Sequence, residues 1–237
     1  NFNCRLVFAQ SKANYYQEQR EESELIRQHF SDLAVSESEE FTPYLSPSLI
    51  SPKIVLDINS PTLVAETLDA GVEILFLFGT EILGEEWLNA FPNRIINLHL
   101  GLSPYYRGSA TLFWPFYFMQ PQYAGVTFHQ IVPEADAGDI VHQSVPKLFR
   151  GDGIHDVSAR AVVQAREDLS KLLDIYMREN RWVMSSQNSS GRLFLTKDFK
   201  PHHLRVIYDL FDNDMVDHYL SEAFIDNLPK LIQQKGV

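Results

Sequence analysis

Polar side chains interrupt one apolar stretch of the chain, and this pattern predicts a strand that carries chemistry near its end. The run Ile95–Leu100 is apolar except for Asn97 and His99, and it ends before Gly101. Such a run, closed by turn-forming residues, predicts a buried strand. Because successive side chains of a strand point to opposite faces, Asn97 and His99 share one face. In a parallel sheet both would lie near the carboxyl end of the strand, where open α/β sheets bind ligands.

The same reasoning predicts alternating strands and helices along the rest of the chain. Nearly continuous apolar runs indicate buried strands, and apolar positions at helical spacing indicate helices. The expected strands are 4–9, 54–58, 72–78, 95–100 and 125–131. The expected helices are 21–30, 61–70, 85–90, 154–180 and a helical section within 201–225, with a long loop over 31–51. Strand, helix and strand over 72–100 imply a right-handed crossover that sets the two strands parallel and adjacent.

Two further patterns concern the interior and the carboxy-terminal part. The aromatic-rich stretch 108–120 is expected to be a core helix beneath the site, in preference to a stacking platform. Residues 182–184 and 193–195 are apolar and flank the turn-forming segment 188–191, which predicts a β-hairpin.

Composition narrows the class of protein. A chain of 237 residues with 45% hydrophobic residues suits one sizeable globular domain with a small appendage. Its 31 acidic and 20 basic residues give a net charge of −11, which argues against a nucleic-acid partner. No apolar stretch is long enough to span a bilayer and no signal-peptide pattern opens the sequence. The single cysteine, Cys4, is expected to be a buried thiol, which fits a reducing cytoplasm.

An acid downstream gives the Asn97–His99 pair a partner. Asp136 lies in a short loop after the strand 125–131, from which it could reach and orient His99. The alternative is that Asn97 and His99 are hydrogen-bonded core residues with no chemistry. His129 is either a positioning partner or a core histidine, and we favour the core. The remaining histidines show no metal-ligand spacing, so no metal site is expected.

Four motifs, taken in order, resemble the folate-dependent formyltransferases, which act on glycinamide ribonucleotide, methionyl-tRNA or nucleotide-linked sugars. The motifs are Asn97-Leu98-His99, Ser103–Gly108, Gly125–His129 and Asp136–Ile140. The resemblance implies an α/β, Rossmann-like, three-layer fold with a mostly parallel twisted sheet. It places the catalytic domain at 1–180 and a carboxy-terminal hairpin and helical extension at 181–237. A first strand and helix of the family have no counterpart in these residues, and we expect them to precede the sequence given.

The resemblance also implies roles for individual residues. Asn97 and His99 would stabilise the oxyanion of a tetrahedral intermediate or accept a proton, and Asp136 would hold the imidazole. The implied folate-binding residues are Thr80, Glu81, Ile82, Leu83, Val132, Glu134 and Ala135. The acceptor-binding candidates are Ser103, Tyr105, Tyr106 and Arg107. Arg107 would either meet a phosphate or carboxylate of the acceptor or tie its own loop to a backbone carbonyl.

The expected activity is transfer of a formyl group from 10-formyltetrahydrofolate to a primary amine on a nucleotide-linked amino sugar. Glycinamide ribonucleotide is the second choice of acceptor. A formyltetrahydrofolate hydrolase and a non-catalytic folate-binding protein stay open as alternatives. The expected partner is this small-molecule amine, without nucleic acid or membrane, and the carboxy-terminal tail suggests a homodimer.

Overall fold

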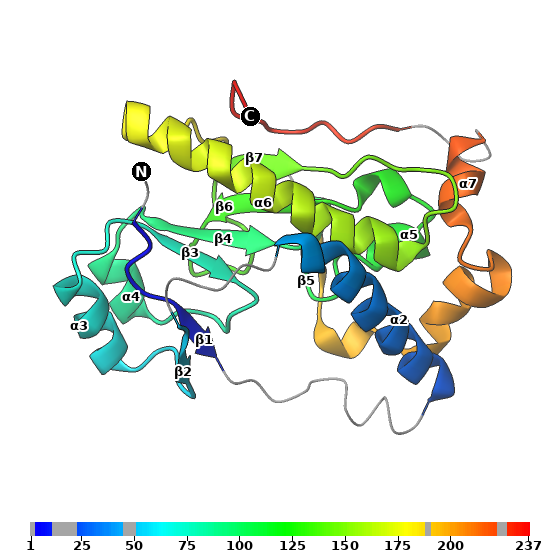
Figure 1. The fold of residues 1–237 in the computed structure, drawn as a ribbon, viewed down its shortest axis with the longest axis horizontal. Helices are drawn as coiled ribbons and strands as arrows, with labels where there is room; N and C mark the ends of the chain where they lie inside the picture. Colours follow the sequence, from blue (N-terminus) through cyan, green and yellow to red (C-terminus); the bar gives the residue numbers. More distant parts are fainter. Residues whose placement is uncertain (1–2, 11–22, 45–50, 188–190, 222–226) are drawn as a thin grey trace.

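A four-stranded sheet carries Asn97 and His99 on its strand β4 (Ile95–His99) (Figure 1). The computed structural model describes residues 3–10, 23–44, 51–187, 191–221 and 227–237. The strands are β3 (Leu75–Phe78), β4 (Ile95–His99), β6 (Val126–Gln130) and β7 (Ile140–Ser144), in the spatial order β3-β4-β6-β7. The helix α4 (Glu85–Ala90) connects β3 to β4, and these strands are parallel, which confirms the expected crossover.

The α/β class is confirmed, but the prediction of a mostly parallel sheet is wrong for these four strands. β6 runs antiparallel to β4, and β7 runs antiparallel to β6. The connection between β6 and β7 is residues 131–139, which is too short for the helical crossover that parallel strands need. The two neighbours β6 and β7 therefore form an antiparallel half of the sheet.

Two helices and a second, two-stranded sheet build the amino-terminal part. β1 (Phe8–Gln10) pairs parallel with β2 (Lys53–Val55), separately from the larger sheet. The helix α3 (Pro61–Asp69) starts with proline at its first position, where the missing N–H costs nothing. An apolar cluster joins α3 and α4 to the strands, with members Val55, Ile58, Leu63, Val64, Leu83, Trp87, Phe91 and Ile95.

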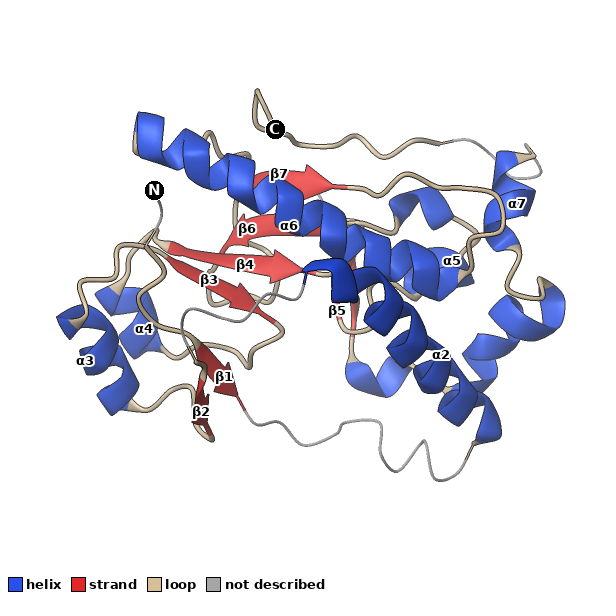
Figure 2. Cartoon of the chain, in the orientation of Figure 1, coloured by secondary structure: helices blue, strands red, loops and turns tan. Residues whose placement is uncertain are grey.

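The long helix α6 (Ile154–Glu179) crosses the sheet and covers one face (Figure 2). Ile96 and Phe128 of the strands belong to one buried cluster with Ala161, Ala165 and Leu172 of the helix. Small alanines allow the helix to approach the sheet closely. Because α6 takes the face that carries Ile96, the polar side chains that alternate with Ile96 lie on the other face.

The first described helix is longer than expected. α2 (Glu24–Phe41) begins at the cap Ser23, whose Oγ accepts the Ile26 N–H at 3.4 Å, and it packs against α6. The expectation of a loop is wrong for residues 31–41, because packing on α6 keeps this polar stretch helical. A short 3₁₀ helix, Thr42–Tyr44, follows, and residues 45–50 of the expected loop lie outside the described residues.

The carboxy-terminal part returns to the core. β5 (Tyr106–Gly108) pairs parallel with β8 (Arg192–Phe194), while Ser185 bridges to Ile140 of β7. The predicted hairpin is therefore wrong, because its second arm pairs with β5 and the residue that follows its first arm, Ser185, bridges to β7. Its turn, 188–190, lies outside the described residues. The remaining helical segments are α5 (Trp114–Tyr117), the 3₁₀ helices Pro121–Tyr123, Thr196–Asp198 and Pro201–His203, the π-helix Val206–Leu210 and α7 (Met215–Leu220).

The aromatic stretch is confirmed as core. Trp114 is buried, and its ring stacks on Phe194 of β8 with the centroids 4.5 Å apart. Phe113 and Phe116 are buried in the same apolar cluster, although Phe113 also lines the cavity described below, and only Trp114–Tyr117 of the stretch form a helix.

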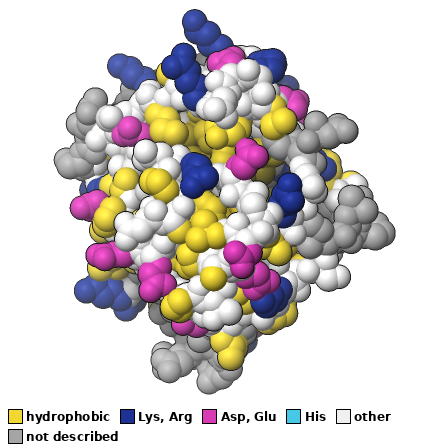
Figure 3. Space-filling view, turned by 90° about the vertical axis from the view of Figure 1, so that its left-hand side faces the viewer, with side chains coloured by type: hydrophobic (Ala, Val, Ile, Leu, Met, Phe, Trp, Pro, Cys, Tyr) yellow, Lys and Arg dark blue, Asp and Glu magenta, His cyan; other side chains and the backbone are white. Residues whose placement is uncertain are grey.

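Among the described residues, the face over α3 and α4 carries charges of both signs. Figure 3 shows acidic, basic and apolar side chains interspersed on that face. Cys4 is exposed, so the prediction of a buried thiol is wrong. Within the described residues, no helix is both long and apolar enough to cross a membrane.

Candidate active site

A cavity of about 1060 Å³ opens at the carboxyl ends of β3 and β4. Two loops border it, residues 79–83 after β3 and residues 131–136 after β6. The polar side chains of Asn97, His99 and His129 line it together with Asp136. The sheet thus brings three expected residues and one further histidine into a single cavity.

Asp136 is the centre of this group. Its Oδ2 accepts the Gly108 N–H at 2.9 Å and lies 3.5 Å from Nδ1 of His99. Its Oδ1 lies 3.3 Å from Nε2 of His129 and accepts from Nδ2 of Asn97 at 3.4 Å. The backbone of Asp136 is left-handed, with φ of 50°, a conformation that aspartate tolerates better than most residues. The four side chains therefore form one connected polar cluster.

The antiparallel pairing of β4 with β6 explains why His129 joins the cluster. Asn97 lies directly opposite His129, so their side chains share a face, and Nδ2 of Asn97 is 3.3 Å from Nε2 of His129. The other ring nitrogen, Nδ1, donates to the Gln130 carbonyl at 2.9 Å. In the neutral ring Nε2 thus accepts from the Asn97 amide, whereas in the protonated ring it donates to Oδ1 of Asp136, 3.3 Å away. Our preference for a purely structural His129 did not anticipate this contact with Asn97 and Asp136.

His99 is held in one orientation by the turn after β4. Its Nε2 lies 2.9 Å from the Tyr106 carbonyl oxygen, which only accepts, so Nε2 carries the hydrogen. In the neutral ring Nδ1, on the Asp136 side, then has a free lone pair. A Cβ at Gly101 would lie 2.7 Å from both His99 Nε2 and the Tyr106 oxygen, so this turn leaves no room for a larger residue.

Burial and hydrogen bonding set the charges of this cluster. Burial lowers the pKa of His99 below its usual 6.5, although the Asp136 carboxylate and the Tyr106 carbonyl act to raise it. Burial raises the pKa of Asp136, but the hydrogen bond to His129, the charge of His99 and the Gly108 N–H outweigh it and lower that pKa to about 2. At neutral pH the cluster therefore contains an ionised carboxylate beside a neutral imidazole.

This arrangement suits acyl transfer. Nδ1 of His99 can accept a proton, and Asp136 would then stabilise the imidazolium that forms. The Asn97 amide can redirect one of its two N–H groups from its long contacts with His129 and Asp136 to a developing oxyanion. A proton acceptor, an amide donor and an orienting carboxylate in one cavity are the parts that addition to a carbonyl group requires.

All seven residues expected to bind folate line the cavity. The loop 79–83 is braced by contacts that the sequence did not reveal. Gln10 Oε1 accepts the Glu81 N–H at 3.1 Å, and Asn59 donates to the Ile82 carbonyl at 3.0 Å. Val132, Glu134 and Ala135 stand on the opposite loop. The two loops give the cavity facing walls of aliphatic side chains and main-chain groups.

The expected acceptor-binding residues are not brought to the cavity. Ser103 and Tyr106 are buried, and none of the four lines it. Tyr106 belongs to β5, and its hydroxyl donates to Gln120 at 2.7 Å, away from the cavity. The Arg107 guanidinium donates to the Gly191 carbonyl at 3.4 Å, which matches the second of its two expected roles.

The cavity has a second region that sequence reasoning missed. We call it the α2–α6 arm; it is lined by His29, Phe30, Leu33, Glu37, Ile154, His155, Ser158, Val162 and Phe199. An apolar stripe on α2 was the only sequence signal for this region, and the expected loop after residue 30 hid its continuation to Glu37. Among the residues that the structure describes, no group of three or more His, Cys, Asp or Glu is arranged to hold a metal ion.

Comparisons with known proteins identify the family and the fold of this chain. The family model described as formyl transferase matches residues 6–173 of the chain. The formyltransferase PseJ from Anoxybacillus kamchatkensis, crystallised with UDP-4,6-dideoxy-4-formamido-L-AltNAc and tetrahydrofolate, superposes with a TM-score of 0.55. It is 21% identical, over 75% of this chain and 89% of that chain.

Two further solved structures have the same fold. A sugar N-formyltransferase from a Shewanella species has a TM-score of 0.52 at 20% identity, over 75% of each chain. Glycinamide ribonucleotide transformylase 1 from Symbiobacterium toebii has a TM-score of 0.50 at 23% identity, over 58% of this chain and 68% of that chain. With the family model covering most of the chain, this protein belongs to the formyl transferase family and is a folate-dependent formyltransferase.

Proposed function

We propose that the protein transfers a formyl group from 10-formyltetrahydrofolate to the primary amine of a nucleotide-linked amino sugar. The observation that carries this proposal is the grouping of Asn97, His99 and Asp136 at one end of a single cavity. PseJ, which was crystallised with a formamido sugar nucleotide and tetrahydrofolate, supports this choice of acceptor. The Shewanella sugar N-formyltransferase supports it as well.

The cavity suits the folate donor. Its volume of about 1060 Å³ leaves space for two small molecules side by side. Ile82 and Leu83 on one loop and Val132 on the other offer apolar surface to a flat pterin ring, and the main-chain groups of both loops can pair with its polar edge. These loops would hold the donor with its formyl group towards Asn97.

The residues of the cluster then have distinct tasks. The acceptor amine attacks the formyl carbon, and the Asn97 amide donates to the oxygen that becomes negative. Nδ1 of His99 takes the proton that the nitrogen loses, with Asp136 stabilising the charged ring. The bond from the formyl carbon to the folate nitrogen breaks, this nitrogen gains a proton, and the products are a formamide and tetrahydrofolate. One proton leaves the amine and one joins the folate, so the reaction is balanced.

The acidic balance of the chain favours a small-molecule acceptor over the tRNA that one branch of the family formylates. A cytoplasmic location and a homodimer stay predictions from the sequence.

Folate turnover, followed by absorbance, tests the proposal. The assay uses 10-formyltetrahydrofolate with a panel of nucleotide-linked amino sugars, with glycinamide ribonucleotide, and without amine. We expect turnover that requires an amino sugar and that Asp136→Asn abolishes. Turnover without amine would identify a hydrolase instead, and absence of turnover with every amine would favour a folate-binding protein.

A further inference from the structure

The α2–α6 arm is continuous with the catalytic end of the cavity, yet none of the expected site residues lies in it. Its lining comes from α2, from the first turns of α6 and from Phe199, and the two helices meet at the rings of His29 and His155, whose centroids are 4.5 Å apart. The helix α2 is fixed here by tertiary contacts, since His29 bonds to Tyr208 and Ser36 donates to Asp156 at 3.3 Å. These contacts hold α2 in place as part of the cavity lining.

Glu37 is the charged group of this arm. It lies on the inward stripe of α2 with His29, Phe30 and Leu33, at helical spacing. Its carboxylate has no hydrogen-bond or ion-pair partner among the described residues, and burial raises its pKa. A half-buried carboxylate without a partner in a cavity wall is an acceptor available to the donors of a ligand.

The two histidines of the arm, His29 of α2 and His155 of α6, are polar but uncharged. The Tyr208 hydroxyl lies 2.7 Å from Nδ1 of His29 and 3.2 Å from Nε2 of His155. Burial lowers the pKa of His29 to about 3, helped by the neighbouring His155, and lowers the pKa of His155 to about 4. Both rings are thus neutral at physiological pH. The His29 ring stands beside His155 and beside the aromatic side chains of Phe30 and Phe199.

The charged side chains along the whole cavity are negative. The carboxylates of Glu37, Glu81, Glu134 and Asp136 line it, and none of the lining residues that the structure describes is a lysine or arginine. This field attracts cations and hydrogen-bond donors and repels phosphate. Aromatic surface, neutral imidazole and one carboxylate together suit a ring that has an apolar face and hydroxyl groups at its edge.

We propose that the α2–α6 arm binds the sugar ring of the acceptor, that Glu37 accepts hydrogen bonds from its hydroxyl groups, and that any phosphate linked to this sugar lies outside the arm. This inference rests on the proposed function, because it assigns the acceptor of the same reaction. It makes Glu37 a specificity-determining residue that takes no part in the proton transfers.

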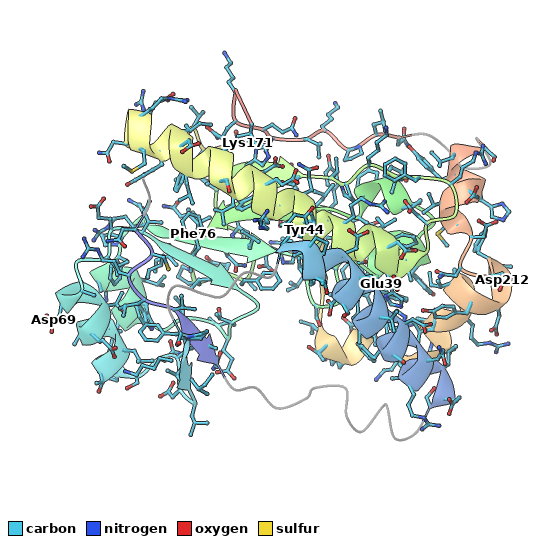
Figure 4. All side chains as sticks on the ribbon, viewed as in Figure 1. Glu39, Tyr44, Asp69, Phe76, Lys171 and Asp212 are labelled. Carbon is cyan, nitrogen blue, oxygen red and sulfur yellow. The ribbon has the colours of Figure 1, made fainter. Side chains whose placement is uncertain are left out.

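Steady-state kinetics of Glu37→Ala test the proposal, with 10-formyltetrahydrofolate and a nucleoside-diphosphate-linked 4-amino-4,6-dideoxyhexose. Loss of a hydrogen bond to a charged group should raise the acceptor KM about tenfold or more, with kcat and the donor KM unchanged. The matched control is Glu39→Ala, because Glu39 lies on the same helix but is exposed and outside the cavity lining (Figure 4). Glu37→Gln, which keeps the shape, should show a smaller rise in the acceptor KM.

A second experiment uses acceptors that lack one ring hydroxyl at a time. For one of them, wild-type kcat/KM should fall while that of Glu37→Ala changes little, because the partner of this hydroxyl is already gone. An unchanged acceptor KM in Glu37→Ala, or equal losses for every deoxy acceptor in both proteins, would overturn the assignment of Glu37 while leaving formyl transfer intact. If wild type shows no turnover with any amino sugar, the proposed function itself fails and this inference falls with it.

Discussion

The Nδ1 atom of His99 lies 3.5 Å from Oδ2 of Asp136, while the other nitrogen of the same ring is occupied by a backbone carbonyl. The carbonyl fixes the position of the hydrogen, so the free lone pair of the neutral ring belongs to Nδ1. The imidazole is thereby prepared to accept a proton on the side where a carboxylate can stabilise the resulting charge.

The pH dependence of the reaction follows from this pair. Neutral His99 is the active form, and burial lowers its pKa below 6.5, so kcat/KM should be retained until the pH falls clearly below 6.5. Asp136, with a pKa of about 2, stays ionised over this range. In Asp136→Asn the charge that raises the His99 pKa is lost, so the acidic limb of any residual activity should move to still lower pH. A pH–rate profile of both proteins measures this, and a midpoint above 6.5 in wild type would contradict it.

Removal of the Asn97 amide should affect the chemical step. Asn97→Ala takes away a donor aimed into the cavity, and such a loss typically lowers kcat about 10²- to 10³-fold. The fold should persist, because Asn97 is only half-buried. Single-turnover kinetics measure the step, and circular dichroism serves as the control. A kcat within threefold of wild type would show that the amide is not an oxyanion donor.

Enlargement of the turn after β4 should disturb His99 without altering any polar group. A Cβ at position 101 would come within 2.7 Å of His99 Nε2, of Thr111 Cβ and of the Tyr106 oxygen. Gly101→Ala should therefore cost about 1–3 kcal/mol of stability and lower kcat at least tenfold. Gly84→Ala is the matched control, since its Cβ would meet only the Asn59 side chain at an ordinary 3.5 Å. Thermal denaturation measures the stability of both variants, and steady-state kinetics measure their kcat. Equal stability and kcat in the two variants would contradict the prediction.

The position of Tyr106 gives a prediction of the opposite kind. Its hydroxyl donates to Gln120 inside the core, away from the cavity, so Tyr106→Phe should leave the acceptor KM unchanged. Loss of this hydrogen bond should lower the free energy of unfolding by about 1 kcal/mol. Chemical denaturation and acceptor titrations measure the two quantities. An increase of the acceptor KM without loss of stability would return Tyr106 to the acceptor site.

Local patterns were sufficient for much of the fold. Expected boundaries agree closely with the structure for α3, α4, β4, β6 and α6, because each combines an apolar pattern with a clear start or stop signal. The shared face of Asn97 and His99 also follows from the period of a strand alone. These features depend on neighbours in sequence.

The features that could not be predicted depend on distant partners. The contact of His129 with Asn97 requires the antiparallel register of β4 and β6, which no local pattern specifies. Likewise, β8 pairs with β5 across more than 80 residues, so an apparent hairpin signal was misleading. The continuation of α2 to Phe41 depends on α6, whose packing outweighs the low helix propensity of a serine-rich stretch.

The helix α2 supplies a wall of the cavity but none of the four side chains in the polar cluster around Asp136. Substitutions along its inner stripe can therefore reshape the space beside the reaction centre while β4 and the loop of Asp136 keep their positions. On the proposal made above, chemistry and selectivity are encoded in separate segments of one chain. A formyltransferase built in this way could change the amine that it modifies by exchange of a single helix, with its reaction machinery unaltered.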